Sequence, residues 1–267
     1  MEPIISARDL VVRRGDTPLS FDVYEGLTLL IAERESGAST RNMALAGRFR
    51  PKGGEVLLDG ETTSPRQRFK RVALAGAELI DSLERQVDVR EVIREQVAWS
   101  QMFFIPVRRD ILNHPKVEPW LEPLGLTHLE PSLDVGKLNV EDRFRLRVML
   151  ALIARPDADL VIVDDLDQIR SLKLRNEVIE DLATLSRQVP VLATTVNDPE
   201  EGHVDHIIDL RYGAGPAADA EHDADTGSAL AAAAAEDPWS DDKVSQNNDE
   251  ATDPDKPDTE EIEEVSR

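Results

Sequence analysis

The sequence contains no cysteine, which excludes disulfide bridges and thiolate metal sites. It also lacks any apolar run of the roughly 20 residues that a membrane-spanning helix requires, so we expect no direct membrane insertion. The first ten residues, MEPIISARDL, have neither the basic nor the apolar segment of a signal peptide. These absences predict a soluble, cytoplasmic protein that reaches a membrane only through a partner.

Basic residues are scarce relative to acidic ones, with 31 Lys and Arg against 53 Asp and Glu. No long basic stripe is available to neutralise phosphates, so no nucleic-acid partner is expected. The acidity is concentrated in residues 213–267, which hold 17 acidic and 3 basic residues and almost no large apolar ones. Such a segment cannot bury enough apolar surface to offset its chain entropy. We therefore predict a disordered acidic tail, which either keeps the protein soluble or docks on a basic partner.

The body of the chain, residues 1–212, alternates between strand-like and helix-like patterns. Runs rich in Val, Ile and Leu predict two or three strands before residue 32, followed by strands at 55–58, 72–75, 159–163, 189–195 and 206–210. Helical spacing predicts helices at 39–50, 140–154 and 172–188. Five prolines between residues 106 and 131 limit the region from 77 to 135 to short helices. Strands that alternate with helices predict an α/β fold with a mostly parallel sheet.

Two segments carry a family resemblance: STRNMALAGRFRPKGGEVLLDG at 39–60 and LNVEDRFRLRVMLALIARPDADLVIVDD at 138–165. In order and spacing they resemble the ATP-binding cassette (ABC) ATPases, the nucleotide-binding subunits of ABC transporters. The resemblance covers about residues 4–212 and implies ATP and magnesium as ligands. It also implies a P-loop NTPase-like fold with a mostly parallel sheet, an N-terminal antiparallel β subdomain and a small helical subdomain inserted at 77–135. Residues 1–212 would then form one nucleotide-binding domain.

The stretch AERESGAST, residues 32–40, stands where the family has its phosphate-binding loop. In that loop a lysine pairs with the phosphates and a Ser or Thr hydroxyl binds magnesium. Gly37, Ser39 and Thr40 are retained, but the lysine position is Ala38. The loop also contains two glutamates, which would repel a phosphate. We therefore predict that ATP binds weakly or not at all.

Two arginines are candidates to replace the missing lysine: Arg34 in the loop and Arg41 in the helix that follows. A long flexible arginine is not equivalent to a lysine held in place, so the replacement would be imperfect. Ser39 is the expected magnesium ligand if nucleotide binds. A second interpretation of Ser39 and Thr40 is that they cap the helix.

The family's magnesium aspartate and catalytic glutamate correspond to Asp164 and Asp165, at the end of the strand predicted at 159–163. Aspartate is one methylene shorter than glutamate, and general-base geometry is sensitive at about that scale. The pair also fits a structural role, capping or ion-pairing neighbouring loops. Asn197 corresponds to the family's switch histidine, and no glutamine stands near 75–77, where the family has its magnesium sensor. Catalysis is therefore expected to be poor.

The family's signature motif, LSGGQ, contacts the nucleotide bound to the other subunit of a dimer. Glycines there permit close approach of the backbone to a phosphate, whereas a valine blocks it. Two carboxylates in the first turn favour the helix N-terminus themselves and oppose a phosphate. We therefore expect a good helix start and a poor phosphate clamp at the corresponding residues, Leu138, Asn139, Val140, Glu141 and Asp142.

The resemblance also implies two protein partners. One is a homo- or heterodimeric partner of the same family, and the other is a membrane-spanning transporter subunit that contacts residues 77–135. That region contains an apolar cluster, of which we expect most members to fill the core and one or two to meet the partner. The cluster consists of Trp99, Met102, Phe103, Phe104 and Ile105.

Three functions remain open. The first is an ATP-binding subunit of an ABC transporter with a degenerate site and a structural or regulatory role, bound to the cytoplasmic face of the membrane through its partner. The second is a non-catalytic scaffold or adaptor that keeps the fold for protein contacts. The third is a slow ATPase in which Arg34 or Arg41 replaces the lysine.

Overall fold

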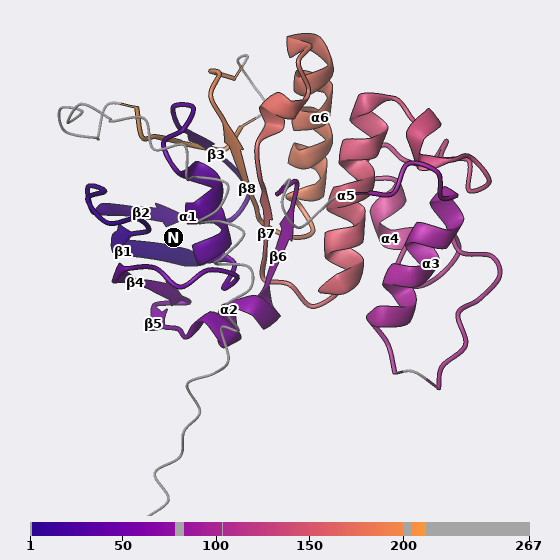
Figure 1. Cartoon of the computed structure of the whole chain (residues 1–267), viewed down its shortest axis with the longest axis horizontal. Coiled ribbons are helices and arrows are strands. Elements are labelled where there is room, and N and C mark those ends of the chain that lie inside the picture. Colours follow the sequence, from indigo (N-terminus) through magenta and orange to yellow (C-terminus); the bar gives the residue numbers. More distant parts are fainter. Residues whose placement is uncertain (1, 78–82, 103, 200–203, 212–267) are drawn as a thin grey trace, which may run out of the picture.

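A computed structural model describes residues 2–77, 83–102, 104–199 and 204–211, so the acidic tail predicted at 213–267 lies outside the described residues. A parallel sheet of five strands forms the centre, in the order β6-β7-β8-β3-β9 (Figure 1). Its strands are β3 (Leu27–Ile31), β6 (Val72–Ala75), β7 (Leu160–Val163), β8 (Val191–Thr195) and β9 (His206–Asp209). Four of them have every residue buried, which explains their continuous apolar runs.

A second, antiparallel sheet comes mainly from the N-terminal part of the chain, in the order β2-β1-β4-β5. Its strands are β1 (Ile5–Val11), β2 (Leu19–Val23), β4 (Gly53–Leu58) and β5 (Glu61–Thr62). Helix α1 (Ala38–Leu45) packs between this sheet and one face of the parallel sheet, and the three share one apolar cluster. Helix α2 (Pro65–Arg71) connects β5 to β6 and begins with a capping box at Ser64.

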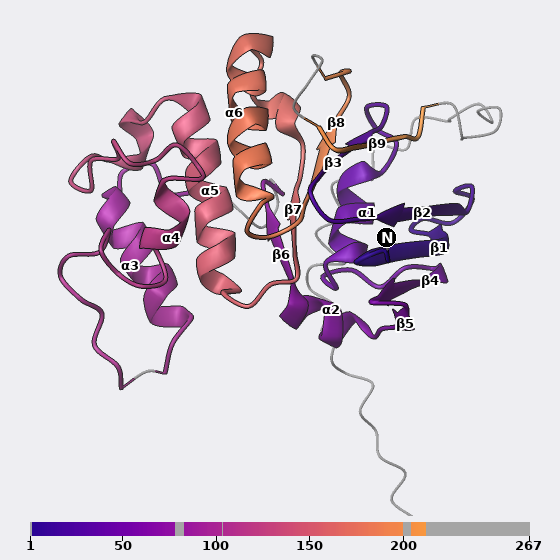
Figure 2. The same cartoon turned by 180° about the vertical axis from the view of Figure 1, so that it is seen from behind.

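The other face of the parallel sheet is covered by α5 (Val140–Ala154) and α6 (Leu172–Leu185), as Figure 2 shows from behind. Beyond α5 lie α3 (Val89–Trp99) and α4 (Glu118–Leu121), joined by irregular segments. Two short 3-10 turns, η1 (Val135–Lys137) and η2 (Leu166–Gln168), precede α5 and follow β7. The buried residues of α3, α5, α6 and the sheet form one continuous cluster. The helical region therefore packs onto the sheet through α5.

The predicted fold class is confirmed, and so are the strand at 72–75 and the helix at 140–154. The helix predicted at 39–50 is shorter and ends at Leu45. Gly47 has a φ of 70°, and a Cβ atom there would lie 2.1 Å from the carbonyl oxygen of Pro65. Only glycine fits this left-handed turn, which redirects the chain before β4.

The apolar cluster at the end of α3 does not fill the core as expected. Trp99 is 79% exposed, Met102 64% and Phe104 66%. Phe103 lies outside the described residues. The core of the helical region is formed instead by residues such as Ile93 and Val97, one turn apart on the buried face of α3. None of the helices in the described part of the chain has both the length and the hydropathy of a membrane span.

Candidate functional site

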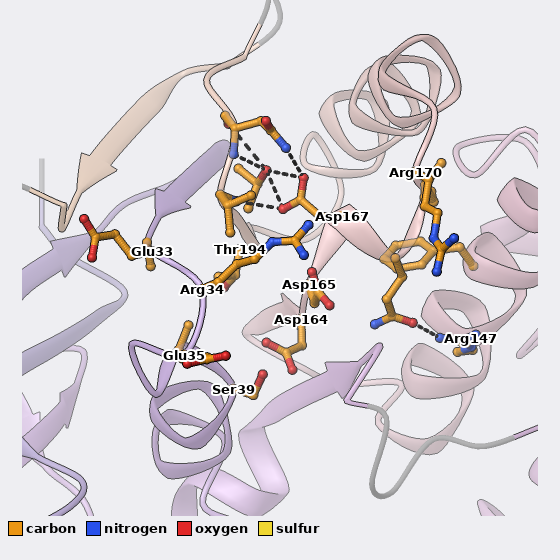
Figure 3. Close-up of a pocket in the computed structure, with 18 of the residues that line it drawn as sticks. Glu33, Arg34, Glu35, Ser39, Arg147, Asp164, Asp165, Asp167, Arg170 and Thr194 are labelled. Carbon is orange, nitrogen blue, oxygen red and sulfur yellow. Dashed lines mark hydrogen bonds between the residues drawn. The ribbon is translucent and has the colours of Figure 1, made fainter. Parts of the chain in front are cut away.

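A cavity of about 1120 Å³ opens where the carboxyl ends of β3, β7 and β8 meet. Crevices outside the carboxyl ends of parallel strands are the usual ligand sites of open α/β sheets. Figure 3 shows that the loop after β3 forms one side of this cavity and that Arg147 and Arg170 stand on the opposite side, with Asp164 and Asp165 between them. The cavity brings together most of the site residues predicted from the sequence, namely Arg34, Gly37, Ala38, Ser39, Thr40, Val140, Asp164, Asp165 and Asn197.

The loop after β3 has an unusual backbone for its sequence. Glu35 adopts a left-handed conformation with a φ of 64°, which is strained for a residue with a Cβ atom. Gly37 is also left-handed and is the N-cap of α1, with no side chain bonded to the helix end. The helix-cap interpretation of Ser39 and Thr40 is therefore wrong. The N–H groups in the first turn of a helix have no intrahelical acceptors, so they stay available to an anion.

The two candidate replacements for the lysine have different positions. Arg41 is only 5% exposed, and its guanidinium donates hydrogen bonds to the carbonyl oxygen of Ser36 at 2.5 Å and to its Oγ at 3.0 Å. Burial lowers the pKa of Arg41, and this side chain fastens the loop to α1. Arg34 is exposed and lines the cavity, with its side chain towards Asp165 in Figure 3. Of the two, Arg34 is the one placed to meet a ligand.

Asp164 is almost completely buried, and its carboxylate accepts a hydrogen bond from an asparagine of α1. Asn42 donates through Nδ2 to Oδ1 of Asp164 at 2.6 Å and to Oγ1 of Thr194 at 2.7 Å. Asn42 has no exposed surface. No role for this residue is predicted from the sequence, yet its side chain connects α1 to the ends of β7 and β8.

Asp167, two residues after Asp165, is the centre of a second network. Its carboxylate accepts hydrogen bonds from the backbone N–H of Val196 at 2.7 Å and from Nδ2 of Asn197 at 2.5 Å. Arg175, which is 2% exposed, lies 3.5 Å from the same carboxylate. Asn197 is thus held by η2, and its amide is turned to Asp167.

Asp165 and Gln168 shape the floor of the cavity. Asp165 is left-handed, with a φ of 46°, and begins the η2 turn. Gln168 donates to the carbonyl oxygen of Gly76 at 2.7 Å and accepts from Nη1 of Arg147 at 2.6 Å. A glutamine therefore does lie beside the end of β6, although residues 75–77 contain none.

Helix α5 begins within the five signature-motif positions, which confirms the expected helix start. Oδ1 of Asn139, the N-cap, accepts a hydrogen bond from the backbone N–H of Asp142 at 2.7 Å. The Asp142 carboxylate turns inward, where it accepts from His128 Nε2 at 2.8 Å and from Arg145 at 3.0 Å. Leu138 is buried, while Val140 is 44% exposed and lines the cavity. An exposed valine side chain thus lies at the cavity, next to the N-terminus of α5.

The residues fit magnesium and ATP only in part. Ser39 and Asp164 offer the oxygen ligands that magnesium accepts. Among the described residues, no group of three or more His, Asp or Glu side chains is arranged to hold a metal ion, so magnesium would depend on phosphate oxygens brought by the nucleotide. For the phosphates, the first turn of α1 offers free N–H groups. Position 38 has an alanine in place of a lysine, and the glutamates of the loop add negative charge.

Comparisons with known proteins agree on the fold. No protein-family model matches the sequence. The energy-coupling factor transporter ATP-binding protein EcfA2 of Thermotoga maritima is 26% identical over 216 residues, which cover 76% of this chain and 77% of that protein. The structure of cbiO1 from Clostridium perfringens, part of the ABC transporter complex cbiONQ, is similar with a TM-score of 0.60 and 13% identity, covering 74% of this chain and 80% of that one.

A third relative is an ATP-binding cassette of an ABC transporter, MJ1267. Its TM-score is 0.63 at 15% identity, and the similarity covers 78% of this chain and 88% of that one. The chain therefore has the ABC ATPase fold, and the resemblance to ABC ATP-binding subunits that the sequence motifs predict is confirmed.

Proposed function

We propose that the chain is the ATP-binding-type subunit of an ABC-type membrane transporter and that its own nucleotide site is degenerate, leaving it a structural or regulatory role. The observation that carries this proposal concerns two positions in the cavity that match the family's phosphate-binding lysine and magnesium aspartate: residue 38 is an alanine, and Asp164 is already bonded to Asn42. Both changes act on the groups that would hold the phosphates and the metal.

Phosphate binding is weakened first by charge. A lysine at position 38 would place one cation at the start of α1, and Ala38 places none. Glu33 and Glu35 are exposed in the same loop and line the cavity, so they repel a polyphosphate. The helix N-terminus and Ser39 remain, and they support weak binding at most.

Hydrolysis is weakened by geometry. Asp165 stands in a left-handed turn at the position of the catalytic glutamate, and its shorter side chain is poorly suited to orient an attacking water. Asn197, at the position of the switch histidine, donates its amide to Asp167 and has no imidazole to share a proton. These residues leave little general-base chemistry.

The surface at the end of α3 supports a membrane-spanning partner. Trp99 is exposed and lines a groove of about 460 Å³, whose other apolar lining comes from β6, the segment before α3, α3 itself and α5. Exposed clusters of large apolar residues mark protein or membrane contacts. This surface would place the protein at the cytoplasmic face of a membrane, with a transporter subunit in the groove. The lining includes Leu83, Val87, Val92, Leu150 and Ala151.

Titration of the full chain with a fluorescent ATP analogue and magnesium tests the nucleotide part of the proposal. We expect saturation only in the range of about 0.1 to 1 mM, with displacement by ATP and no steady turnover. Binding at low micromolar concentration together with turnover that Asp164→Asn abolishes would contradict it. No binding at millimolar ATP would favour the scaffold function, in which the fold is kept for contacts alone.

A slow ATPase is the second candidate, and the position of Arg34 in the cavity favours it. If Arg34 replaces the lysine, Arg34→Ala should abolish both nucleotide binding and any residual turnover. Arg41→Ala distinguishes the two arginines, because Arg41 holds the loop to α1 and lies outside the cavity lining. An unchanged affinity in Arg34→Ala would exclude this candidate.

A further inference from the structure

One side of the cavity carries four arginines whose charge is not compensated. This arginine wall consists of Arg85, Arg143, Arg147 and Arg170, all of which line the cavity. Figure 3 shows Arg147 and Arg170 on the side opposite the loop after β3. Among the described residues, none of the four forms an ion pair. The wall therefore presents cations to whatever enters the cavity.

The hydrogen bonds of the arginine wall are made to neutral groups. Arg143 donates to backbone carbonyl oxygens at 3.0 and 3.4 Å, and Arg147 donates through Nη1 to Oε1 of Gln168 at 2.6 Å. The Nε atom of Arg147 is buried and has no hydrogen-bond partner among the described residues. Burial, followed by the charges of Arg85 and Arg147, lowers the pKa of Arg143, while the charge of Glu141 acts in the opposite direction. An anion among these cations would relieve their repulsion.

The same cavity also exposes apolar side chains. Val140 is 44% exposed and Leu172 is 55% exposed, and both line the cavity. A small inorganic anion would leave these side chains in water. An acidic peptide with an aromatic residue would cover them and pair with the arginines at the same time. Clusters of arginine are a recurring means of binding acidic peptides.

The chain itself contains such a peptide. Residues 213–267 hold 17 acidic and 3 basic residues, and the segment 236–242, EDPWSDD, has four carboxylates around Trp239. No other Phe, Tyr or Trp occurs in residues 213–267. Carboxylates form paired hydrogen bonds with arginine, and the face of a tryptophan ring attracts a guanidinium. The segment 236–242 therefore matches the wall in charge and supplies an apolar group.

The described chain ends at the edge of the sheet where the cavity opens. Strand β9 runs parallel to β3, so the carboxyl ends of both strands lie at this edge. After β9, Leu210 donates its N–H to the carbonyl oxygen of Ile31 at 2.8 Å. Arg211 then donates to the carboxylate of Asp198 at 2.6 Å, and Asp198 follows Asn197, which lines the cavity. The acidic tail therefore begins beside the cavity.

The arginine wall is within reach of the segment 236–242. Strands β9 and β7 are three positions apart in the sheet, which corresponds to about 14 Å, and Arg170 follows β7. About 24 residues separate Arg211 from residue 236, and even a helix of that length would span about 36 Å. Linkage within one chain raises the local concentration of the segment to about the millimolar range, so weak contacts suffice.

We propose that residues 236–242 of this chain dock in its own cavity, with their carboxylates against the arginine wall and Trp239 against Val140 and Leu172. The tail then occupies the arginine-lined side of the cavity and excludes other anions from it. This contact involves one chain and needs no nucleotide, so it stands whether or not the site binds ATP.

A disulfide between two introduced cysteines tests this contact in the full chain. The sequence has no cysteine, so Leu172→Cys with Ser240→Cys provides one thiol at the cavity and one beside Trp239. Under mild oxidation we expect an intramolecular disulfide, identified by peptide mass, at a rate that does not depend on protein concentration. Raising the salt from 0.1 M to 1 M shortens the screening length from about 10 Å to about 3 Å and should slow the reaction about tenfold.

Charge reversal in this cysteine pair identifies the contacting groups. Arg85→Glu with Arg170→Glu reverses two exposed arginines that make no side-chain hydrogen bond among the described residues. Glu236→Lys with Asp237→Lys reverses two carboxylates of the segment. Each double variant should slow disulfide formation about tenfold. All four substitutions in one chain should recover most of the original rate, because lysine then faces glutamate.

Matched controls separate this contact from net charge. Arg108→Glu with Arg109→Glu changes the net charge as reversal of the wall does, at exposed residues outside the cavity lining. Glu260→Lys with Glu261→Lys changes the tail by the same charge outside the segment 236–242. Both controls should react like the parent cysteine pair. Each rate is divided by the rate at which the same thiols react with a small disulfide, because neighbouring charges change the thiolate fraction.

Four results would overturn the proposal. A disulfide that forms mainly between two chains would assign the contact to a second copy. A wall reversal no slower than its Arg108 and Arg109 control, or a combined variant that stays slow, would show that the arginines do not hold the segment. An equal loss in the Glu260 and Glu261 control would assign the contact to another part of the tail.

Discussion

The segments that follow two strands of the parallel sheet place their carboxylates in opposite environments. After β7, Asp164 and Asp167 are held by hydrogen bonds from α1, β8 and the segment after β8. After β3, Glu33 and Glu35 are exposed and make no ion pair among the described residues. Both segments correspond to the chemical centre of an ABC ATPase. The polar groups of the first now stabilise the protein itself, while those of the second remain directed outward.

This difference has a consequence for stability. A buried carboxylate needs a hydrogen-bond or cationic partner, because an unsatisfied buried group is costly. After β7, Asn42 donates to Asp164, and Arg175 lies beside Asp167. An exposed loop has no such requirement, so its charges are free to change. The two segments should therefore respond differently to substitution.

The largest effect is expected at Asp167. Asp167→Ala removes the carboxylate facing the buried Arg175 guanidinium and should lower the free energy of unfolding by about 3 to 5 kcal/mol. Asp157→Ala, at an exposed residue, should change it by less than about 0.5 kcal/mol. Urea denaturation of both variants measures the difference. Equal stability of the two would show that the network after β7 contributes nothing.

Asn42→Ala should have the next largest effect. It removes the amide that bonds Asp164 and Thr194 and should cost about 2 kcal/mol of stability, because a carboxylate then stays buried with fewer donors. Asn113→Ala is a matched control, since Asn113 is exposed and donates only to Asp110 across one turn. Thermal unfolding in the same buffer compares them. A loss as small as that of the control would mean that Asn42 merely fills space.

Ala38→Lys should change ligand affinity and leave stability alone. A lysine there adds a cation at the start of α1 and should tighten binding of ATP with magnesium about tenfold, equivalent to about 1.4 kcal/mol. Ala98→Lys adds the same charge at an exposed position of α3 and should have no effect on binding. Isothermal titration of both variants tests this. No gain in Ala38→Lys would indicate that the backbone of the loop has also diverged.

Glu35→Gly should produce the smallest effect, and an opposite one. Glycine adopts the left-handed conformation of residue 35 without strain, so the protein should gain about 0.5 to 1 kcal/mol in stability after the entropic cost of glycine. Glu35→Ala removes the same charge and keeps the unfavourable φ, so it serves as the control. A gain of equal size in both variants would assign the effect to charge repulsion in place of backbone strain.

The sequence predicts the helices, strands and motif positions well, but it predicts poorly which side chains form hydrogen bonds with one another. The strand at 72–75 and the helix at 140–154 have residue patterns that suffice without knowledge of the rest of the chain. Asn42 and Asp164 are 122 residues apart, so the bond between them depends on the order of the strands. Asn42 follows three other polar residues of α1, Ser39, Thr40 and Arg41, so no local contrast in polarity marks it as the residue with a buried partner.

The exposure of the apolar residues at the end of α3 is a second point at which the structure differs from the prediction. Hydrophobicity alone favoured a buried position for Trp99, yet Trp99 is among the most exposed large apolar residues of the described chain. The side chains at Ile93 and Val97 share the buried face of α3, and Trp99 falls outside that spacing. Helical periodicity was therefore a better guide than composition, because it separates the faces of one helix.

The order of the strands also determines when the protein can fold during synthesis. β3, at residues 27–31, is made early, but its two neighbours in the sheet are β8 and β9, the last strands of the described chain. Most of the body must therefore leave the ribosome before the first central strand acquires a partner. Such distant pairing slows folding and leaves an apolar strand exposed in the growing chain. We expect the N-terminal half to need protection from aggregation until β8 and β9 emerge.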